Sequence, residues 1–278
     1  MFSQKTRADL TNIVLYVIMP CSIFSAFHKG ITPEMLRQCL IVLIAAFGLQ
    51  LLVFVLNKFL YIKFPIERRV VLKYATITNN AAFMGLPILS AVFGSTGVLY
   101  GSIALVPMRI LMWTSGLSLF TKMEAKASLK VLATHPCIWA VILGLAYIFV
   151  PVRLPEFLSG AISSIGDTVR VLPMFIVGSI LSDVKLRDLL DKDCFYYSLF
   201  RLAVIPSIMY GVLTLLQIDY LVTGVVVLAS AMPAANTTAM MAEKYGQDSA
   251  FASKLIFVSV MLSIITLPLI AAFITRLG

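Results

Sequence analysis

Two apolar, membrane-length segments of this chain carry asparagine, proline and small residues in their middle. The first contains TITNNAAFMGLP between Thr76 and Pro87, and the second contains ASAMPAANTTAMMAEKYG between Ala229 and Gly246. Non-helical backbone at membrane depth survives only where protein or a water-lined cavity satisfies its amides and carbonyls. A pair of such segments, one in each half of a chain, is typical of the binding site of a secondary transporter.

The composition indicates an all-α polytopic membrane protein. Of the 278 residues, 60% are hydrophobic and 13% are charged, whereas a soluble domain carries about 25% charged residues. The net charge of +9 would favour nucleic-acid binding in a soluble protein. Here the basic residues lie in short gaps between apolar runs, where they orient helices. We therefore expect membrane lipid, and no nucleic acid, around this chain.

Windows of about 20 residues predict nine transmembrane helices with connections too short for a soluble domain. The predicted spans lie near residues 10–28, 35–61, 70–93, 97–120, 131–150, 157–182, 194–216, 220–243 and 249–275. One side of the membrane receives 13 lysines and arginines from the connections and ends, and the other side receives 4. The richer side is cytoplasmic by the positive-inside rule. We expect a plasma membrane (bacterial inner membrane) protein with a cytoplasmic N-terminus and an extracytoplasmic C-terminus.

Landmarks recur in the same order in the two halves, which indicates an internal repeat. A helix with a central proline, Pro20 or Pro173, comes first in each half, and an interrupted helix with Asn80 or Asn236 follows two helices later. The order of these landmarks supports a duplicated unit, although the two halves share little identity.

The sequence also predicts where the two repeats meet and how they are oriented across the membrane. Residues 1–121 form a first repeat of four helices with its broken helix at 70–93, and residues 128–278 form a second repeat of five with its broken helix at 220–243. One more helix before Met1 would give two five-helix repeats of opposite orientation. We expect that the chain lacks this first helix, either through loss or because the true start codon lies upstream.

The segments NNAAFMGLPILSAVFGSTGVLYGS and MPAANTTAMMAEKYGQDSAFASKLIFVSVMLSIITLPL resemble the auxin efflux carrier family. Bacterial members of this family include proposed malate and malonate permeases, and the family pattern has ten helices. The resemblance covers nearly the whole chain and implies an elevator-type homodimer, in which a scaffold stays still while two crossing, broken helices carry the substrate. Asn80 and Pro87 match the asparagine and proline of the family's NxxFxGLP motif, and Pro233 and Asn236 match those of the second half.

The chemistry of a broken helix agrees with this resemblance. Free N–H groups at a break attract a carboxylate, and free carbonyls hold a cation. The substrate-binding candidates are Asn80, Asn236, Thr237, Asn79 and Met84, and the helix-break candidates are Gly85, Pro87 and Pro233. The alternative is that the asparagines only join helices by hydrogen bonds and that the threonine and methionine only pack.

Charged residues inside the predicted spans are further candidates because their burial in hydrocarbon is costly. Asp167 and Arg170 lie three residues apart and can form an ion pair. The alternatives are proton uptake by Asp167 or an anion contact by Arg170. Arg109 has no acidic neighbour in its own span and needs a carbonyl, a distant acid or an anionic substrate. Arg201 and Lys254 lie nearer to segment ends, where snorkelling to the interface is expected.

The remaining motifs argue against an enzyme. The cysteines form no CxxC pair, and the chain contains neither HExxH nor GxxxxGK[ST], so no cofactor, no metal and no direct use of ATP are expected. The acidic run Asp191–Asp193 is interpreted as a solvated loop rather than a metal-bound nucleotide-sugar site.

We therefore expect a permease or efflux carrier that moves a small organic anion, such as malate, malonate or an auxin-like acid, by alternating access. Transport coupled to H+, transport coupled to Na+ and uniport all stay open. The alternative functions are a non-transporting membrane protein, such as an inactive shortened carrier relative, and a membrane-embedded enzyme.

Overall fold

The computed structural model describes residues 4–28, 33–116, 118–120, 136–148, 154–172, 175 and 191–276. These residues form helices joined by turns, with one isolated β-bridge and no other β-structure among them. Within this described part, four helical segments are long and apolar enough to cross a membrane by length and composition: Glu34–Phe59, Ala81–Leu111 (which turns sharply at Gly94), Lys192–Leu215 and Ser249–Thr275. The all-helical class is confirmed, and the total of nine spans stays a prediction. The expected repeat boundary near residue 121 lies outside the described residues.

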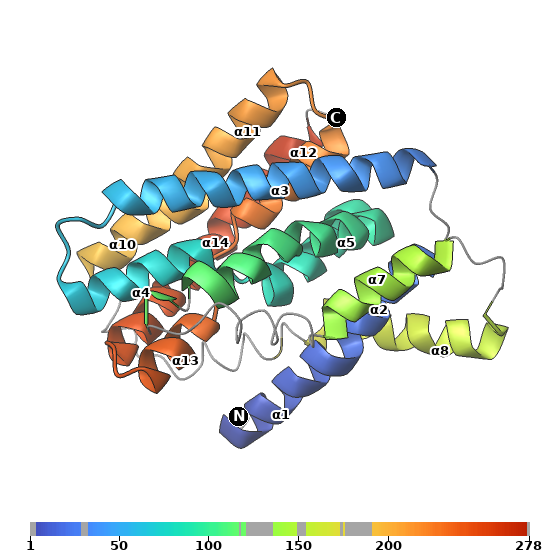
Figure 1. Ribbon diagram of the computed structural model, residues 1–278, viewed down its shortest axis with the longest axis horizontal. Helices are drawn as coiled ribbons and strands as arrows, with labels where there is room; N and C mark the ends of the chain where they lie inside the picture. Colours follow the sequence, from blue (N-terminus) through green and yellow to red (C-terminus); the bar gives the residue numbers. More distant parts are fainter. Residues whose placement is uncertain are drawn as a thin grey trace.

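A first group of helices gathers around α2 at the lower right of Figure 1. Helix α2 (Met19–His28) continues α1 (Gln4–Ile13) and the π-helix η1 (Val14–Ile18), and it packs against α7 (Pro136–Ile148) and α8 (Glu156–Asp167). Gly166 permits the close approach of α8, because an added Cβ would lie 2.8 Å from the Cα of Ser22. Small residues let membrane helices approach in this way.

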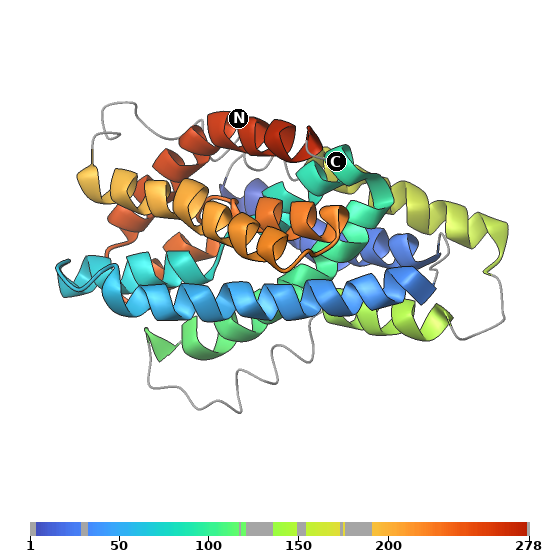
Figure 2. The same ribbon diagram turned by 90° about the horizontal axis from the view of Figure 1, so that it is seen from above.

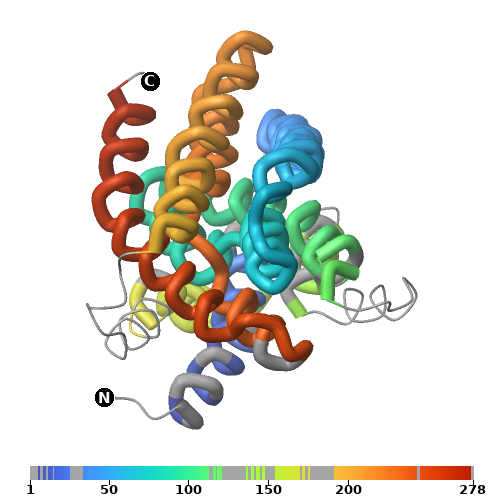
Figure 3. The backbone as a smooth tube through the Cα atoms, turned by 90° about the vertical axis from the view of Figure 1, so that its left-hand side faces the viewer, coloured from blue at the N-terminus to red at the C-terminus, as the bar shows by residue number. Residues whose placement is uncertain are grey.

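A second group contains the other long helices. Its members are α3 (Pro33–Phe59), α4 (Ile66–Ile77), α5 (Leu86–Leu111), α10 (Lys192–Leu199), α11 (Ile205–Leu215), α12 (Tyr220–Ser230), α13 (Thr237–Lys244) and α14 (Ser249–Thr275). Figure 2 shows α10 and α11 between α3 and α14. Helix α5 packs against both α3 and α12 and also contacts α2, so it joins the two groups. In Figure 3, α1 lies below this bundle and the end of α14 lies at its top.

Helix α3 shows why the sequence favours a membrane bundle. Its 27 residues are apolar on nearly every face, which is typical of a helix surrounded by protein and lipid. One side of it is buried through Val42, Ala46, Leu49 and Val53, and the other exposes Leu40, Ile44, Phe47 and Leu51. The exposed side therefore has the character of a lipid-facing surface.

Helix α5 contains a sharp turn at Gly94. The backbone there has φ 63° and ψ −148°, a conformation that only glycine adopts without strain. Beyond the turn, an added Cβ at Gly101 would lie 2.5 Å from Leu89 Cδ1 and 3.0 Å from Leu86 Cδ2. The two halves of α5 thus fold back against each other, at the predicted connection between the spans 70–93 and 97–120.

Candidate functional site

The first asparagine motif lies where helix α4 ends. Helix α4 stops at Ile77, Thr78 is extended with φ −108° and ψ 127°, and the helix resumes as the π-helix η2 (Ala81–Gly85) that leads into α5. Pro87 lies within the helix that continues from η2, six residues after Ala81, where a proline leaves a carbonyl of the preceding turn without its helical hydrogen bond. The non-helical segment is therefore Thr78–Asn80, before the proline.

The second motif lies where helix α12 ends. Helix α12 stops at Ser230, residues 231–236 are not helical, and α13 begins at Thr237. Pro233 lies inside this segment, and its carbonyl oxygen accepts a hydrogen bond from the backbone N–H of Asn80 at 2.8 Å. We call Thr78–Asn80 the first break and Ala231–Asn236 the second break.

The two breaks are joined directly. Asn79 and Ala234 form an antiparallel bridge, and the side-chain Nδ2 of Asn79 donates to the carbonyl oxygen of Ala229 at 2.6 Å. Its Oδ1 accepts from the N–H of Ala81 at 3.3 Å. Gly85 lies against the second break, because an added Cβ would be 3.3 Å from Met232 Cγ. Asn79 therefore joins the two breaks by hydrogen bonds, and a substrate contact of this residue stays a prediction.

A buried arginine binds the carbonyl groups at both helix ends. Arg201, in the π-helix η6 (Phe200–Val204), is 1% exposed. Its Nε donates to the carbonyl oxygen of Met232 at 3.2 Å, and its Nη1 donates to that of Thr76 at 3.0 Å. The snorkelling predicted for Arg201 is wrong, because the Thr76 carbonyl in the last turn of α4 and the Met232 carbonyl in the second break satisfy the guanidinium in the interior.

Two tyrosines support the same end of α4. The hydroxyl of Tyr197, one turn before Arg201, donates to the carbonyl oxygen of Ala75 at 2.9 Å. The Tyr61 hydroxyl and the Thr76 Oγ1 are 2.8 Å apart and share a hydrogen bond. These phenols are the ionisable groups that interact with Arg201, and none of the described carboxylates pairs with it. The dipoles of the Thr76 and Met232 carbonyls offset part of its charge.

Four buried polar atoms near the beginnings of the following helices have no hydrogen-bond partner among the described residues. They are Asn80 Nδ2, Thr237 Oγ1, Thr238 Oγ1 and Tyr74 Oη. Asn80 is 2% exposed, and Thr238 and Tyr74 are 0% exposed. The hydroxyls of Tyr74 and Thr237 face each other outside hydrogen-bond geometry. An unpaired buried polar group costs about 1–3 kcal/mol, and a ligand that supplied hydrogen-bond partners to these atoms would offset that cost.

The helix ends in this region thus have two polarities. The end of α4 and the second break present the carbonyls that Arg201 binds. The beginnings of η2 and α13 present N–H groups and carry the unpartnered side chains of Asn80, Thr237 and Thr238. Helix beginnings favour negative charge. The arrangement can therefore hold an anion on one side while a fixed cation occupies the other.

The other predicted residues have different surroundings. Met84 is buried in η2, and Asn236 is half-buried, with its carbonyl oxygen accepting from the N–H of Met240 at 3.4 Å. Arg109 is buried in the last turn of α5. Asp167 is exposed at the last position of α8, and Arg170 lies in the short helix η4 (Thr168–Arg170), with its side chain outside the description. Substrate, coupling or anion contacts of these residues stay predictions.

Sequence reasoning missed Arg201 and Tyr74 as members of this region. The signal for Arg201 was present, because the predicted span 194–216 offers it no acid, the same reason that singled out Arg109. Tyr74 lies one turn before Thr78. Nothing in the sequence singles it out, since a tyrosine inside a helix is usually a packing residue.

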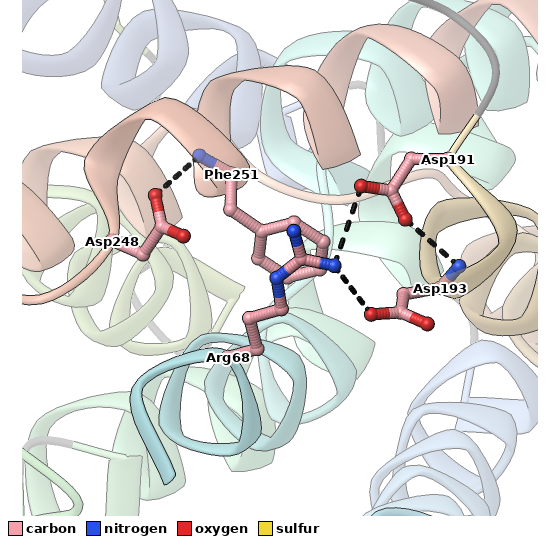
Figure 4. Close-up of polar contacts among 5 residues, drawn as sticks. All are labelled: Arg68, Asp191, Asp193, Asp248 and Phe251. Atoms are coloured by element: carbon pink, nitrogen blue, oxygen red, sulfur yellow. Dashed lines mark hydrogen bonds and ion pairs between the residues drawn. The ribbon is translucent and has the colours of Figure 1, made fainter. Parts of the chain in front are cut away.

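A cluster of charged residues lies at the other end of α4, away from the breaks (Figure 4). Arg68 Nη1 is 2.6 Å from an oxygen of Asp193 and 3.4 Å from one of Asp191, and its guanidinium lies 4.6 Å from the centre of the Phe251 ring. The Asp193 hydrogen bond raises the pKa of Arg68. Asp191 caps α10, and Asp248 caps α14. The solvated loop predicted for Asp191–Asp193 is wrong, because Asp193 lies in α10 and both carboxylates contact Arg68 of α4, which in turn lies against Phe251 of α14.

Comparisons with known proteins agree with a transport function. The family model described as membrane transport protein matches residues 1–271. The chain is 25% identical over 270 residues to an uncharacterized transporter of Methanocaldococcus jannaschii, covering 94% of this chain and 87% of the relative. It is 32% identical over 202 residues to an uncharacterized transporter of Methanothermobacter thermautotrophicus, covering 71% of this chain and 66% of the relative.

Proposed function

The chain belongs to the membrane transport protein family, and on that basis we propose that it is a secondary transporter that moves a small organic anion by alternating access. Family membership and the long apolar helices make it a multi-pass membrane transport protein. Our proposal adds three points: the substrate is an anion, it moves by alternating access, and the protein lies in the inner membrane with a cytoplasmic N-terminus.

The observation that carries the proposal is the group of unpartnered donors beside the helix beginnings. Asn80 Nδ2 and the hydroxyls of Thr237 and Thr238 are buried without partners in the described part of the chain. A carboxylate accepts several hydrogen bonds at once and is attracted to helix beginnings. A small dicarboxylate such as malonate would supply the missing acceptors, with Asn80, Thr237 and Thr238 as its contacts.

The arrangement of the helices supports a moving and a fixed part. Helices α2, α7 and α8 form one packed group, and both breaks belong to the other group. We propose that the group around α2 is the scaffold of an elevator-type homodimer and that the group with the breaks carries the anion. Helix α5, which contacts both groups, would then lie along the sliding surface.

Uptake into proteoliposomes tests the function. The full chain is reconstituted, and the entry of labelled malonate and malate is measured against empty vesicles. We expect uptake by the unaltered protein and its loss in Asn80→Ala and in Asn236→Ala.

The matched control for these variants is Asn57→Ala. Asn57 is a buried asparagine whose Nδ2 donates to the Lys73 carbonyl oxygen at 3.0 Å, so its loss affects stability without touching the breaks. Unaltered uptake in both Asn80→Ala and Asn236→Ala would remove the proposed site. A well-folded wild-type protein that moves none of the carboxylates would favour a non-transporting membrane protein instead.

A further inference from the structure

Arg201 occupies a position that a mobile cation could otherwise take. The carbonyl ends of interrupted helices coordinate the coupling Na+ in several transporter folds. Here the carbonyl oxygens of Thr76, in the last turn of α4, and of Met232, in the second break, both accept hydrogen bonds from the same guanidinium. The side chain that binds them is part of η6 and stays with the protein through every transport cycle.

We propose that Arg201 is a resident counter-cation, which replaces a soluble coupling cation at the breaks and balances the charge of the bound anion. The second half of this statement rests on the proposed function. Two consequences follow for the molecule: anion binding does not require Na+ or another metal cation, and anion binding weakens when the guanidinium is removed.

The electrostatic reason is the state of Arg201 without substrate. An arginine stays protonated at any physiological pH, and taking a lone cation out of water costs several kcal/mol. Carbonyl dipoles offset part of this cost, but no described carboxylate completes an ion pair with Arg201. The region around the breaks therefore keeps an excess of positive charge, which favours an anion and disfavours a second cation.

The guanidinium of Arg201 is connected to the proposed anion site through the backbone of the second break. Arg201 binds the carbonyl of Met232, and the N–H of Asn80 binds the carbonyl of Pro233, the next residue. The Asn80 side chain carries one of the unpartnered donors. Arg201 also ties the second break to the end of α4 through Thr76. It therefore acts as a positioning residue for both breaks as well as a source of charge.

The first experiment measures anion binding and its dependence on cations. The purified full chain is heated with increasing malonate in sodium chloride or in choline chloride of equal ionic strength, and the malonate-induced rise in Tm is recorded. We expect equal rises in the two salts. A rise that requires Na+ would overturn the proposal.

Variants of Arg201 test the charge itself. Arg201→Gln should weaken the apparent malonate affinity on the order of 30-fold, because it removes a buried, hydrogen-bonded charge, and Arg201→Lys should retain part of the affinity. Arg37→Gln is the control, because the Arg37 side chain is 71% exposed and makes a loose contact with Glu34. Unchanged affinity in Arg201→Gln would overturn the inference and leave the proposed function standing.

The second experiment needs no anionic substrate. Arg201→Ala removes the guanidinium and leaves the carbonyls of Thr76 and Met232 without their donors. Millimolar guanidinium should raise the Tm of Arg201→Ala, whereas it should not raise that of the wild type or of Arg37→Ala. Equal effects of guanidinium on all three proteins would contradict the resident-cation position. If malonate fails to stabilise the wild type but guanidinium rescues Arg201→Ala, the substrate class is wrong and the cation position holds.

Discussion

Asn80 and Arg201 donate to consecutive carbonyl groups of the second break, those of Pro233 and Met232. One donor comes from the first break and the other from η6. Between them they satisfy two carbonyls of this non-helical segment, which lie beyond the end of α12 at Ser230 and have no helical partners. The backbone of the second break is therefore held by two segments that are distant in sequence, and the side chain of Asn80 remains available at the centre of this arrangement.

The neighbouring asparagines of the first break should respond differently to alanine. Asn79→Ala removes hydrogen bonds to Ala229 and Ala81 and should lower the unfolding free energy by about 1–3 kcal/mol, the cost of stranded buried groups. Asn80→Ala removes an unpartnered Nδ2 and should leave stability nearly unchanged while abolishing malonate uptake. Thermal unfolding and uptake of the two variants are compared side by side. Equal loss of stability in both would refute this division of roles.

Two buried tyrosines provide a second contrast. Tyr197→Phe strands the Ala75 carbonyl, so we expect a destabilisation of about 1–3 kcal/mol. Tyr74→Phe removes a hydroxyl that has no hydrogen-bond partner in the described structure, so the fold should tolerate it and the apparent malonate affinity should change. Denaturant or thermal unfolding, together with malonate titration, distinguishes the two. A stable Tyr197→Phe protein would show that water replaces the lost donor.

The two halves of α5 can pack against each other only because residue 97, where they touch, is glycine. Gly97→Ala would place a Cβ against the backbone carbonyl of Leu89, too close for either helix half to keep its position, and should sharply reduce the yield of folded protein. Gly48→Ala is the control, because nothing lies within 4 Å of its added Cβ in α3. Alanine there should be neutral or stabilising by about 1 kcal/mol. Size-exclusion profiles and Tm values check both, and a normal Gly97→Ala protein would contradict the packing described for α5.

The charged cluster at the start of α4 should contribute more than a surface pair. Asp193→Asn weakens the 2.6 Å contact with Arg68, which links α4 to α10, and should lower Tm measurably, with a smaller effect at high salt because ions screen the pair. Glu34→Gln alters the exposed pair with Arg37 at 3.7 Å, and such pairs contribute about 0–1 kcal/mol. The Tm of each variant is measured at low and high salt. Similar losses in the two variants would mean that the cluster is only a surface contact.

The breaks were predictable in place but not in internal geometry. Asparagine and proline within apolar segments indicated where helices could not continue, and α4 and α12 do end beside these motifs. The non-helical part of the first motif nevertheless lies before Pro87, at Thr78–Asn80. The reason is that Pro87 lies inside the helix directly after the π-helix η2, and a proline beside a π-helix can bend a helix without ending it, so its presence marks the neighbourhood of the break and not the residue where the chain is extended.

The sequence by itself determined the membrane class, the family and the positions of the two motifs, because apolar length and local backbone preference are properties of neighbouring residues. Only the tertiary structure decided which asparagine joins the breaks, which one keeps a free donor, and that Arg201 is buried against the carbonyls of Thr76 and Met232. A buried cation is tolerated where the fold brings dipoles to it. Those dipoles come from helices far away in the chain, so their arrival cannot be inferred from the residues around the arginine.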